Sequence, residues 1–393
     1  MKRSTIILIL GLAGFTVMAD NWVVSPILPA IAQNIGVSVT TASLLITSYM
    51  IPFGLFQLVF GPLADRFGKR QILNLAIFLF TFAAALTALG KGLGDLAVYR
   101  ALTGAFAASV MPVSLALIAD LVPMQERQAA IGTFMGISFL GQGLSMAIGG
   151  SIAFFLSWRG VFIAYALLAA IVTLLLLTVG RHIPSAKNPN SRFLAPYGRL
   201  LGTARSLALY LVVLLEGILI VGSFSFLGAF IEHTFQFNYL SIGFIMTAFG
   251  VLAVTGGRIS GKLAGSWGRK KVLLVGLALA TVADLVFFLF GNFLLLLIIG
   301  VGLLGLGFML AHSTLLTIAT EFAAQARGAA MSLVAFCFMG GGGIGTAIGG
   351  RIIKSIDYSN FFALYGLALL VLLFLASFLI KAEIKSVVKP VQA

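Results

Sequence analysis

The chain has 393 residues, of which 60% are hydrophobic and 9% are charged. A soluble domain carries roughly 25% charged residues, so this composition excludes a water-facing surface over most of the molecule. The formal net charge of +14 is compatible with a nucleic-acid partner, and the positions of the charges therefore decide what it means.

Twelve apolar runs, each close to the roughly 20 residues that cross a bilayer, follow one another along the chain. They lie at 5–31, 40–60, 71–90, 95–121, 129–156, 160–180, 206–231, 239–260, 272–291, 294–320, 329–350 and 360–380. These runs predict an all-α membrane protein with twelve transmembrane helices. The first run follows Lys2 and Arg3 as in a signal peptide, but it continues to about residue 31, and we interpret it as a retained span.

A polar stretch at 181–205 divides the twelve runs into two sets of six. Pro184 and Pro189 argue against a continued membrane helix there. We therefore expect a six-helix bundle at 1–180, a cytoplasmic linker at 181–205, and a second bundle at 206–393 that ends in a short cytoplasmic tail.

The basic residues fall mainly on one side of these runs. With the N-terminus placed inside, 20 of the 25 Lys and Arg residues lie in inner segments, and 5 lie outside or within spans. This bias follows the positive-inside rule, so the net charge reports topology and argues against a nucleic-acid partner. We expect a multi-pass monomer in the lipid bilayer of the plasma (cytoplasmic) membrane, with both termini cytoplasmic.

The chain repeats itself once with an offset of 200 residues. The segment GPLADRFGKR at 61–70 returns as GKLAGSWGRK at 261–270, and AIGG occurs at both 147–150 and 347–350. Two homologous membrane halves explain this pattern, and such an architecture places the binding site on the axis between them. The chemistry does not repeat, since Gly265 stands where the first copy has Asp65.

Glycine is concentrated within the spans, and the fifth span carries Gly132, Gly141, Gly149 and Gly150. Small residues let membrane helices approach closely. These glycines serve either static tight packing or a gating interface that slides, and the sequence leaves both interpretations open.

Several motifs resemble the major facilitator superfamily, and its drug/proton antiporter branch in particular. The 61–70 segment matches the first signature of that superfamily, 100–104 (RALTG) resembles the second, and 158–162 (WRGVF) resembles the entry to the sixth span. The antiporter signature in the fifth span is partial, because Ser145 and Met146 replace its glycine–proline pair. The resemblance covers the whole chain and implies two pseudo-symmetric six-helix bundles.

The resemblance also implies that spans 1, 4, 7 and 10 line a central cavity. Each of them carries one ionisable residue, and these four are the candidates for substrate binding and proton coupling: Asp20, Arg100, Glu216 and His312. A charge in a membrane span costs roughly 2.5–3.5 kcal/mol, so such groups face a cavity or a partner.

Depth suggests how these four residues pair. Glu216 and His312 both lie roughly 15 Å from the cytoplasmic face and can meet, and Asp20 and Arg100 can pair in the outer half. Desolvation favours a neutral carboxyl and a cationic neighbour favours the charged form, so we expect Glu216 and Asp20 to exchange protons. The alternative for Asp20 is a fixed ion pair with Arg100. Asp284, on a peripheral span, is interpreted as a hydrogen-bond partner of a neighbouring helix.

The resemblance implies a second group of residues that latches the cytoplasmic helix ends in one conformational state. Its members are Gly61, Asp65, Arg66, Gly68, Lys69, Arg70 and Arg127. Asp65 is expected to face a helix N-terminus or to pair with Arg127. As an alternative, the basic residues only set the topology.

We therefore predict a secondary active transporter that works by alternating access. The preferred activity is proton-coupled efflux (antiport) of small amphiphilic or cationic compounds, and the alternative is a proton symporter or facilitator for a sugar or an organic anion. No zinc-protease, P-loop or nucleophile-elbow motif is present, so no enzyme activity is expected. The single Cys337 excludes a cysteine-based metal site, and we expect no cofactor, with a proton gradient as the energy source.

Overall fold

The computed structural model describes residues 3–185, 195–322 and 327–380, and every element within these ranges is a helix. The first half of the chain comprises α1 (Arg3–Trp22), α2 (Val24–Ile35), α3 (Val39–Ala42), α4 (Leu44–Phe67), α5 (Lys69–Leu89), α6 (Leu93–Ala107), α7 (Val110–Leu121), α8 (Met124–Phe155) and α9 (Trp158–Thr178). The 3₁₀ turn η1 (Gly180–His182) and α10 (Ala195–Leu201) follow. The second half comprises α11 (Ala204–Glu216), the π-helical turn η2 (Gly217–Val221), α12 (Gly222–Phe235), α13 (Tyr239–Trp267), α14 (Arg269–Phe290), α15 (Leu294–Phe322), α16 (Arg327–Ser355) and α17 (Tyr358–Leu379).

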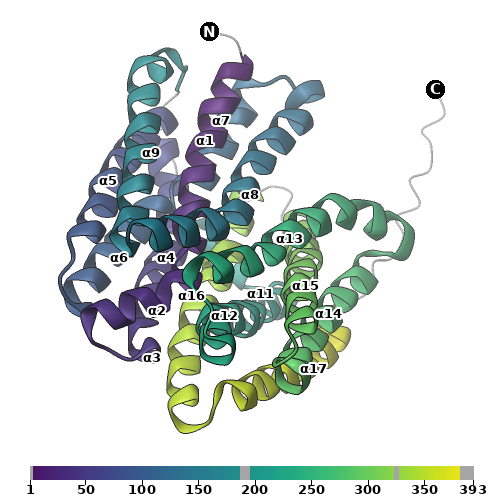
Figure 1. The fold of residues 1–393 in the computed structure, drawn as a ribbon. Helices are drawn as coiled ribbons and strands as arrows, with labels where there is room; N and C mark the ends of the chain where they lie inside the picture. Colours follow the sequence, from purple (N-terminus) through teal and green to yellow (C-terminus); the bar gives the residue numbers. More distant parts are fainter. Residues whose placement is uncertain (1–2, 186–194, 323–326, 381–393) are drawn as a thin grey trace.

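Twelve helical segments of the described ranges are long and apolar enough to cross a membrane. This confirms the predicted all-α membrane fold. In Figure 1 the purple-to-teal helices α1–α9 gather on one side and the green-to-yellow helices α11–α17 on the other, so each half of the sequence forms its own bundle. Part of the linker, 186–194, and the tail at 381–393 lie outside the described residues.

Two expected spans are interrupted near their middle, and a proline explains each interruption. In the first span α1 ends at Trp22, four residues before Pro26. In the fourth span the break lies at Ala108, four residues before Pro112. A helical proline has no N–H for the carbonyl four residues earlier, and its ring clashes with that carbonyl. The backbone hydrogen-bond ladder is therefore broken in both spans.

Glycine allows close helix contacts within the first bundle. A Cβ atom added at Gly141 would overlap the backbone carbonyl of Phe15, and one added at Gly149 would overlap the side chain of Val23. These are the close approaches that small residues permit in membrane helices. The space beside Gly132 is open, so the packing role expected for this glycine is absent in this conformation. A gating role stays a prediction.

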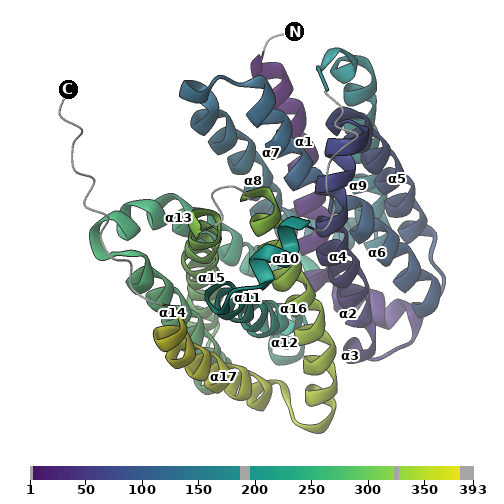
Figure 2. The same cartoon turned by 180° about the vertical axis from the view of Figure 1, so that it is seen from behind.

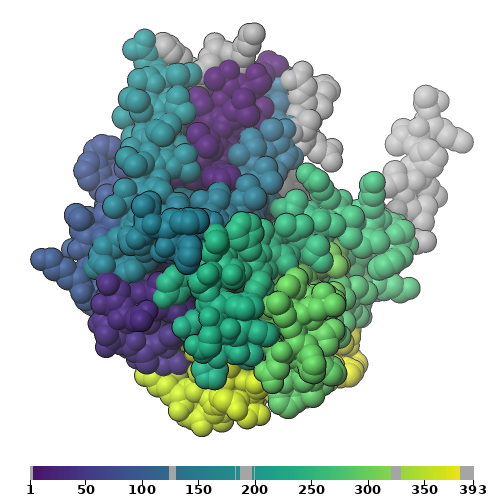
Figure 3. Space-filling view, viewed as in Figure 1, coloured from purple at the N-terminus to yellow at the C-terminus, as the bar shows by residue number. Residues whose placement is uncertain are grey.

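The two bundles touch on the side of the molecule away from the linker. Gly150 of α8 packs against the backbone of α13. The Ser25 hydroxyl donates to the carbonyl of Phe224 at 2.9 Å, and the Thr47 hydroxyl donates to the carbonyl of Gly343 at 3.0 Å. Figure 3 shows the two halves meeting over the lower part of this face, whereas the upper ends of α1 and α13 diverge in Figure 1. The bundles are thus closed at one end and separated at the other.

The linker helix α10 lies against α16 and close to α4, as Figure 2 shows from behind. Pro62 provides no N–H for the carbonyl of Leu58, and the Tyr197 hydroxyl of α10 donates to this carbonyl at 3.0 Å. Burial raises the pKa of the Tyr197 phenol, so the hydroxyl keeps its proton at physiological pH. The linker is therefore anchored where a proline leaves a backbone acceptor open.

We expect Gly141→Ala to lower the stability of the protein and Gly132→Ala to preserve it. The methyl group at position 141 must displace the Phe15 backbone, which costs about 1–3 kcal/mol, whereas position 132 is open and alanine is the better helix former. The measurement is thermal unfolding of both purified variants in the same detergent. Equal melting temperatures for the two variants would contradict this account of the glycine contacts.

Candidate functional site

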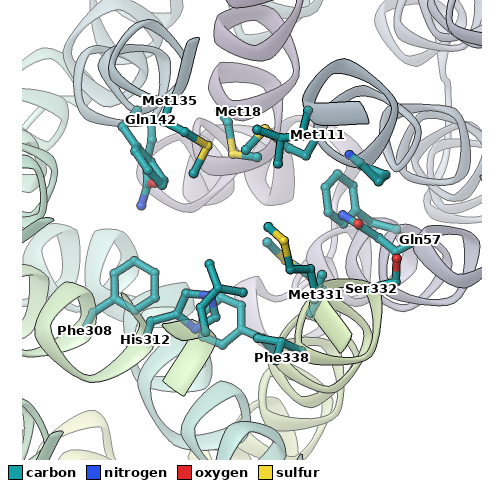
Figure 4. A pocket seen from close by; sticks show the side chains of 18 of the residues that line it. Met18, Gln57, Met111, Met135, Gln142, Phe308, His312, Met331, Ser332 and Phe338 are labelled. Carbon is teal, nitrogen blue, oxygen red and sulfur yellow. The ribbon is translucent and has the colours of Figure 1, made fainter. Parts of the chain in front are cut away.

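A cavity lies between the two bundles and has an empty volume of about 810 Å³, its open mouth included. Its described walls come from α1, α4, α7 and α8 of the first bundle and from α15 and α16 of the second (Figure 4). Spans 1, 4 and 10 thus line it as expected. Span 7 contributes no residue to the described lining, and spans 2, 5 and 11 contribute instead.

The cavity wall is apolar and rich in methionine. The five methionines that line it are Met18, Met111, Met135, Met331 and Met339, out of 11 in the chain. Thioether side chains are flexible and polarizable, so such walls adapt to ligands of different shapes. The sequence does not single out these residues, because a methionine in an apolar span carries no signal of the face on which it lies.

Four polar side chains interrupt this wall. They are Gln57, Gln142, His312 and Ser332. Of the four expected coupling residues, only His312 is among them. Of the aromatic residues in the seventh span, Phe224 is buried behind the wall, where its ring meets that of Trp22 at 4.9 Å.

Glu216 and His312 form a pair at the edge of the cavity. His312 Nδ1 lies 3.2 Å from Glu216 Oε2, which confirms the contact expected from their depths. The Glu216 side chain is fully buried and that of His312 is 19% exposed. The imidazole therefore stands between the carboxylate and the cavity. Its ring lies 4.2 Å from the ring of Phe338, so an aromatic side chain covers part of the imidazole.

The backbone changes its hydrogen-bonding pattern directly after Glu216. α11 ends at this residue and the π-helical turn η2 follows, with Gly217 packed against the carbonyl of Phe338. Single π-helical turns are rare and frequently mark functional sites. No residue pattern in the sequence predicts this turn. Gly217 is the one residue whose type is consistent with the close contact there.

Asp20 and Arg100 form a second ion pair inside the first bundle. Arg100 Nη1 donates to Asp20 Oδ2 at 2.7 Å, and Nη2 donates to the Asp20 carbonyl at 3.3 Å. The exposed fractions of the two side chains are 0% and 1%. The guanidinium also lies 4.2 Å from the centre of the Tyr49 ring and 5.5 Å from that of Phe162. Neither partner lines the cavity, so the geometry favours a fixed ion pair over proton exchange at Asp20.

Asp284 makes the expected contact with a neighbouring helix. The hydroxyl of Ser223 on α12 donates to Asp284 Oδ1 at 2.6 Å, and both side chains are fully buried. The pair lies within the second bundle and outside the cavity wall.

The 61–70 segment joins elements of the first bundle. Lys69 Nζ lies 2.6 Å from Asp120 Oδ2 and 3.8 Å from Asp65 Oδ1, so it ties the ends of α4, α5 and α7 together. Gly68, at φ +102°, separates α4 from α5 in a conformation that favours glycine. Arg66 stacks on the ring of its neighbour Phe67.

The same segment also holds the start of the linker. The Arg70 guanidinium donates to the carbonyls of Arg181 and Ile183, and its backbone N–H donates to the Ser185 hydroxyl at 3.1 Å. Gly61 has open space beside it. The side chain of Arg127, the expected partner of Asp65, lies outside the described residues. A latch between conformational states stays a prediction.

We expect Asp20→Asn and Arg100→Gln each to destabilise the protein more than the two substitutions combined. A single substitution leaves a buried charge without its partner, which costs about 3–5 kcal/mol, whereas the double variant places two neutral amides together. Thermal unfolding of the three variants measures the difference. Additive losses would show that the two side chains do not act as a pair.

Comparisons with known proteins agree with this architecture. The model of the Major Facilitator Superfamily matches residues 10–264 and 209–392. The chain is 26% identical over 356 residues to the MFS-type transporter YceJ of Bacillus subtilis (strain 168), covering 88% of each chain. It is 36% identical over 148 residues to the puromycin resistance protein pur8 of Streptomyces alboniger, a match that covers 37% of this chain and 29% of that relative.

The fold is also that of a solved transporter. The crystal structure of the nucleoside transporter NupG (D323A mutant) superposes with a TM-score of 0.79 at 16% identity, covering 96% of this chain and 100% of the other. The matched family, the relative YceJ and the solved neighbour NupG are transporters and not enzymes. The chain belongs to the Major Facilitator Superfamily.

Proposed function

We propose that this protein is a proton-coupled exporter of small amphiphilic compounds that works by alternating access. The observation that carries the proposal is the Glu216–His312 pair, in which a buried carboxylate is reached from the cavity through a partly exposed imidazole. The match to a puromycin resistance protein supports export of a harmful compound as the biological role.

The proposed coupling depends on the water that reaches His312. In the empty cavity the imidazole can hold a proton beside the Glu216 carboxylate, so that the buried pair is neutral overall. A protonated imidazole carries an N–H on each ring nitrogen, and an apolar substrate in place of that water leaves the N–H that does not face Glu216 without an acceptor. The proton then leaves toward the open side. Substrate and proton thus exclude each other, which is the requirement for exchange.

The orientation of the protein in the membrane follows from the sidedness of the charges. The end that carries the Lys69 cluster and the linker is rich in basic residues, and we assign it to the cytoplasm by the positive-inside rule. The cavity then opens inward in this conformation, both termini are cytoplasmic, and the protein acts as a monomer in the plasma membrane.

The alternative is a symporter or facilitator for a sugar or an organic anion. A sugar needs many hydrogen-bonding groups around it, and among the described lining residues only Gln57, Gln142, His312, Ser332 and the indole N–H of Trp22 offer them. The apolar remainder of the wall therefore favours amphiphilic substrates over sugars.

Reconstitution into liposomes with an imposed pH gradient tests the coupling. We expect amphiphilic compounds to accelerate collapse of the gradient, read with a trapped pH-sensitive dye, and sugars to have no effect. Glu216→Gln should reduce this acceleration to the level of protein-free liposomes, because the variant cannot form the charged pair.

Asp284→Asn is the matched control, since it neutralises another fully buried carboxylate that lies outside the cavity wall. This variant should keep the acceleration. Gradient-driven transport that persists in Glu216→Gln would refute the proposed coupling. Proton uptake that requires an inward gradient of sugar or anion would establish the alternative.

A further inference from the structure

Two hydrogen-bond donors in the cavity wall have no acceptor. Trp22 Nε1 and Gln142 Nε2 are buried, and neither has a partner among the described residues. Both residues line the cavity and are 3% exposed. Buried polar groups in native proteins are almost always satisfied, so an unsatisfied donor needs an explanation. An indole N–H is a donor only, and its chemistry therefore specifies an acceptor.

The surroundings hold these donors in place. The Trp22 ring meets the rings of Phe224 at 4.9 Å, Phe249 at 5.4 Å and Phe308 at 6.0 Å, so the indole is fixed from the second bundle. Figure 4 shows Gln142 extending from the first bundle into the cavity, toward the side that carries Phe308 and His312. The two donors thus belong to a built site and not to a mobile surface.

The same wall offers no carboxylate to anchor a cation. The described lining contains no Asp, Glu, Lys or Arg side chain. The two carboxylates nearest in the fold, Asp20 and Glu216, are fully buried and already paired with Arg100 and His312. The cationic class expected from the sequence depended on Asp20 as the anchor, and that side chain does not reach the cavity.

We propose that the cavity selects neutral apolar compounds that carry a carbonyl-type oxygen, which accepts hydrogen bonds from Trp22 and Gln142. The inference rests on the proposed function, because it assigns the substrate class of the same cavity. The methionine and phenylalanine wall receives the apolar body, and the body covers His312 on the second bundle. Acceptor recognition and proton release thus lie on opposite walls, and one neutral molecule contacts both.

Equilibrium binding to the purified protein in nanodiscs tests this selection without any proton gradient. The probe is radiolabelled benzophenone, which carries the carbonyl. Two unlabelled compounds that lack a carbonyl serve as competitors. Diphenylmethane is neutral, and tetraphenylphosphonium carries a positive charge. We expect benzophenone to bind about tenfold more tightly than diphenylmethane, since one or two hydrogen bonds are lost with the carbonyl. Tetraphenylphosphonium should compete no better than diphenylmethane.

Variants locate the effect. Trp22→Phe keeps an aromatic ring and removes the donor, and Gln142→Leu removes the amide; each should reduce the preference for benzophenone by about 3- to 10-fold. Trp158→Phe is the matched control, because its buried Nε1 also has no partner among the described residues but lies outside the cavity wall. It should leave the preference unchanged.

The result that overturns the inference is a preference for tetraphenylphosphonium, or a benzophenone preference that both cavity variants retain. Size-exclusion profiles verify folding, and Gln142→Leu provides an independent answer if Trp22→Phe does not fold. Because binding is measured without a pH gradient, the inference can fail while proton coupling holds, and proton coupling can fail while the inference holds.

Discussion

The cost of placing charge in the hydrocarbon region governs the arrangement of this molecule. An unpaired charge at the centre of a bilayer costs several kcal/mol, so each described ionisable group deep in a span needs a partner or a water-filled space. Arg100 meets this requirement with Asp20 and two aromatic rings, and His312 meets it with Glu216 and the cavity. The first pair is sealed and the second is reached by water. This difference in access separates a structural ion pair from a site that can exchange a proton.

The internal repeat places residues of different roles at equivalent positions of the two bundles. At an offset of 200 residues, His312 corresponds to Pro112, and both positions line the cavity. The proline interrupts the fourth span, whereas the histidine leaves the tenth span continuous and adds an imidazole to the wall. At equivalent positions, Pro112 thus interrupts the helix of the first bundle, and His312 supplies an ionisable side chain in the second. The repeated Gly141 and Gly341, in contrast, both pack against a backbone carbonyl in their own bundle.

The sequence predicts the spans and the two pairs, because the length of an apolar run and the depth of a residue within it can be counted along the chain. It does not predict which face of an all-apolar helix meets the cavity, since every face is apolar and no periodicity distinguishes them. Only the structure therefore shows that methionines line the cavity and that span 7 lies behind His312 and outside the lining. The π-helical turn after Glu216 packs through Gly217 against the backbone of Phe338, and these two residues are distant in sequence. The breaks before Pro26 and Pro112 carry a signal in the sequence, since a proline acts on its own helix, although the spans expected at 5–31 and 95–121 run through them.

The division of the contacts between the bundles constrains how an alternating-access cycle can be coupled. Each buried ion pair lies within one bundle, so rocking of the bundles breaks neither of them. The described contacts between the bundles include hydroxyl-to-carbonyl hydrogen bonds, such as those of Ser25 and Thr47, and glycine backbone contacts. A neutral hydrogen bond of this kind contributes only about 1 kcal/mol, so these bonds open easily. Their strength does not depend on whether His312 and Glu216 hold a proton. In the proposed exchange, protonation at His312 therefore acts on the first bundle through the substrate in the cavity and through the ring of Phe308, which lies 5.5 Å from that of His312 and 6.0 Å from that of Trp22. Under the proposed proton coupling, the substrate is itself one of the elements that link the two bundles, and an adaptable wall is compatible with that role.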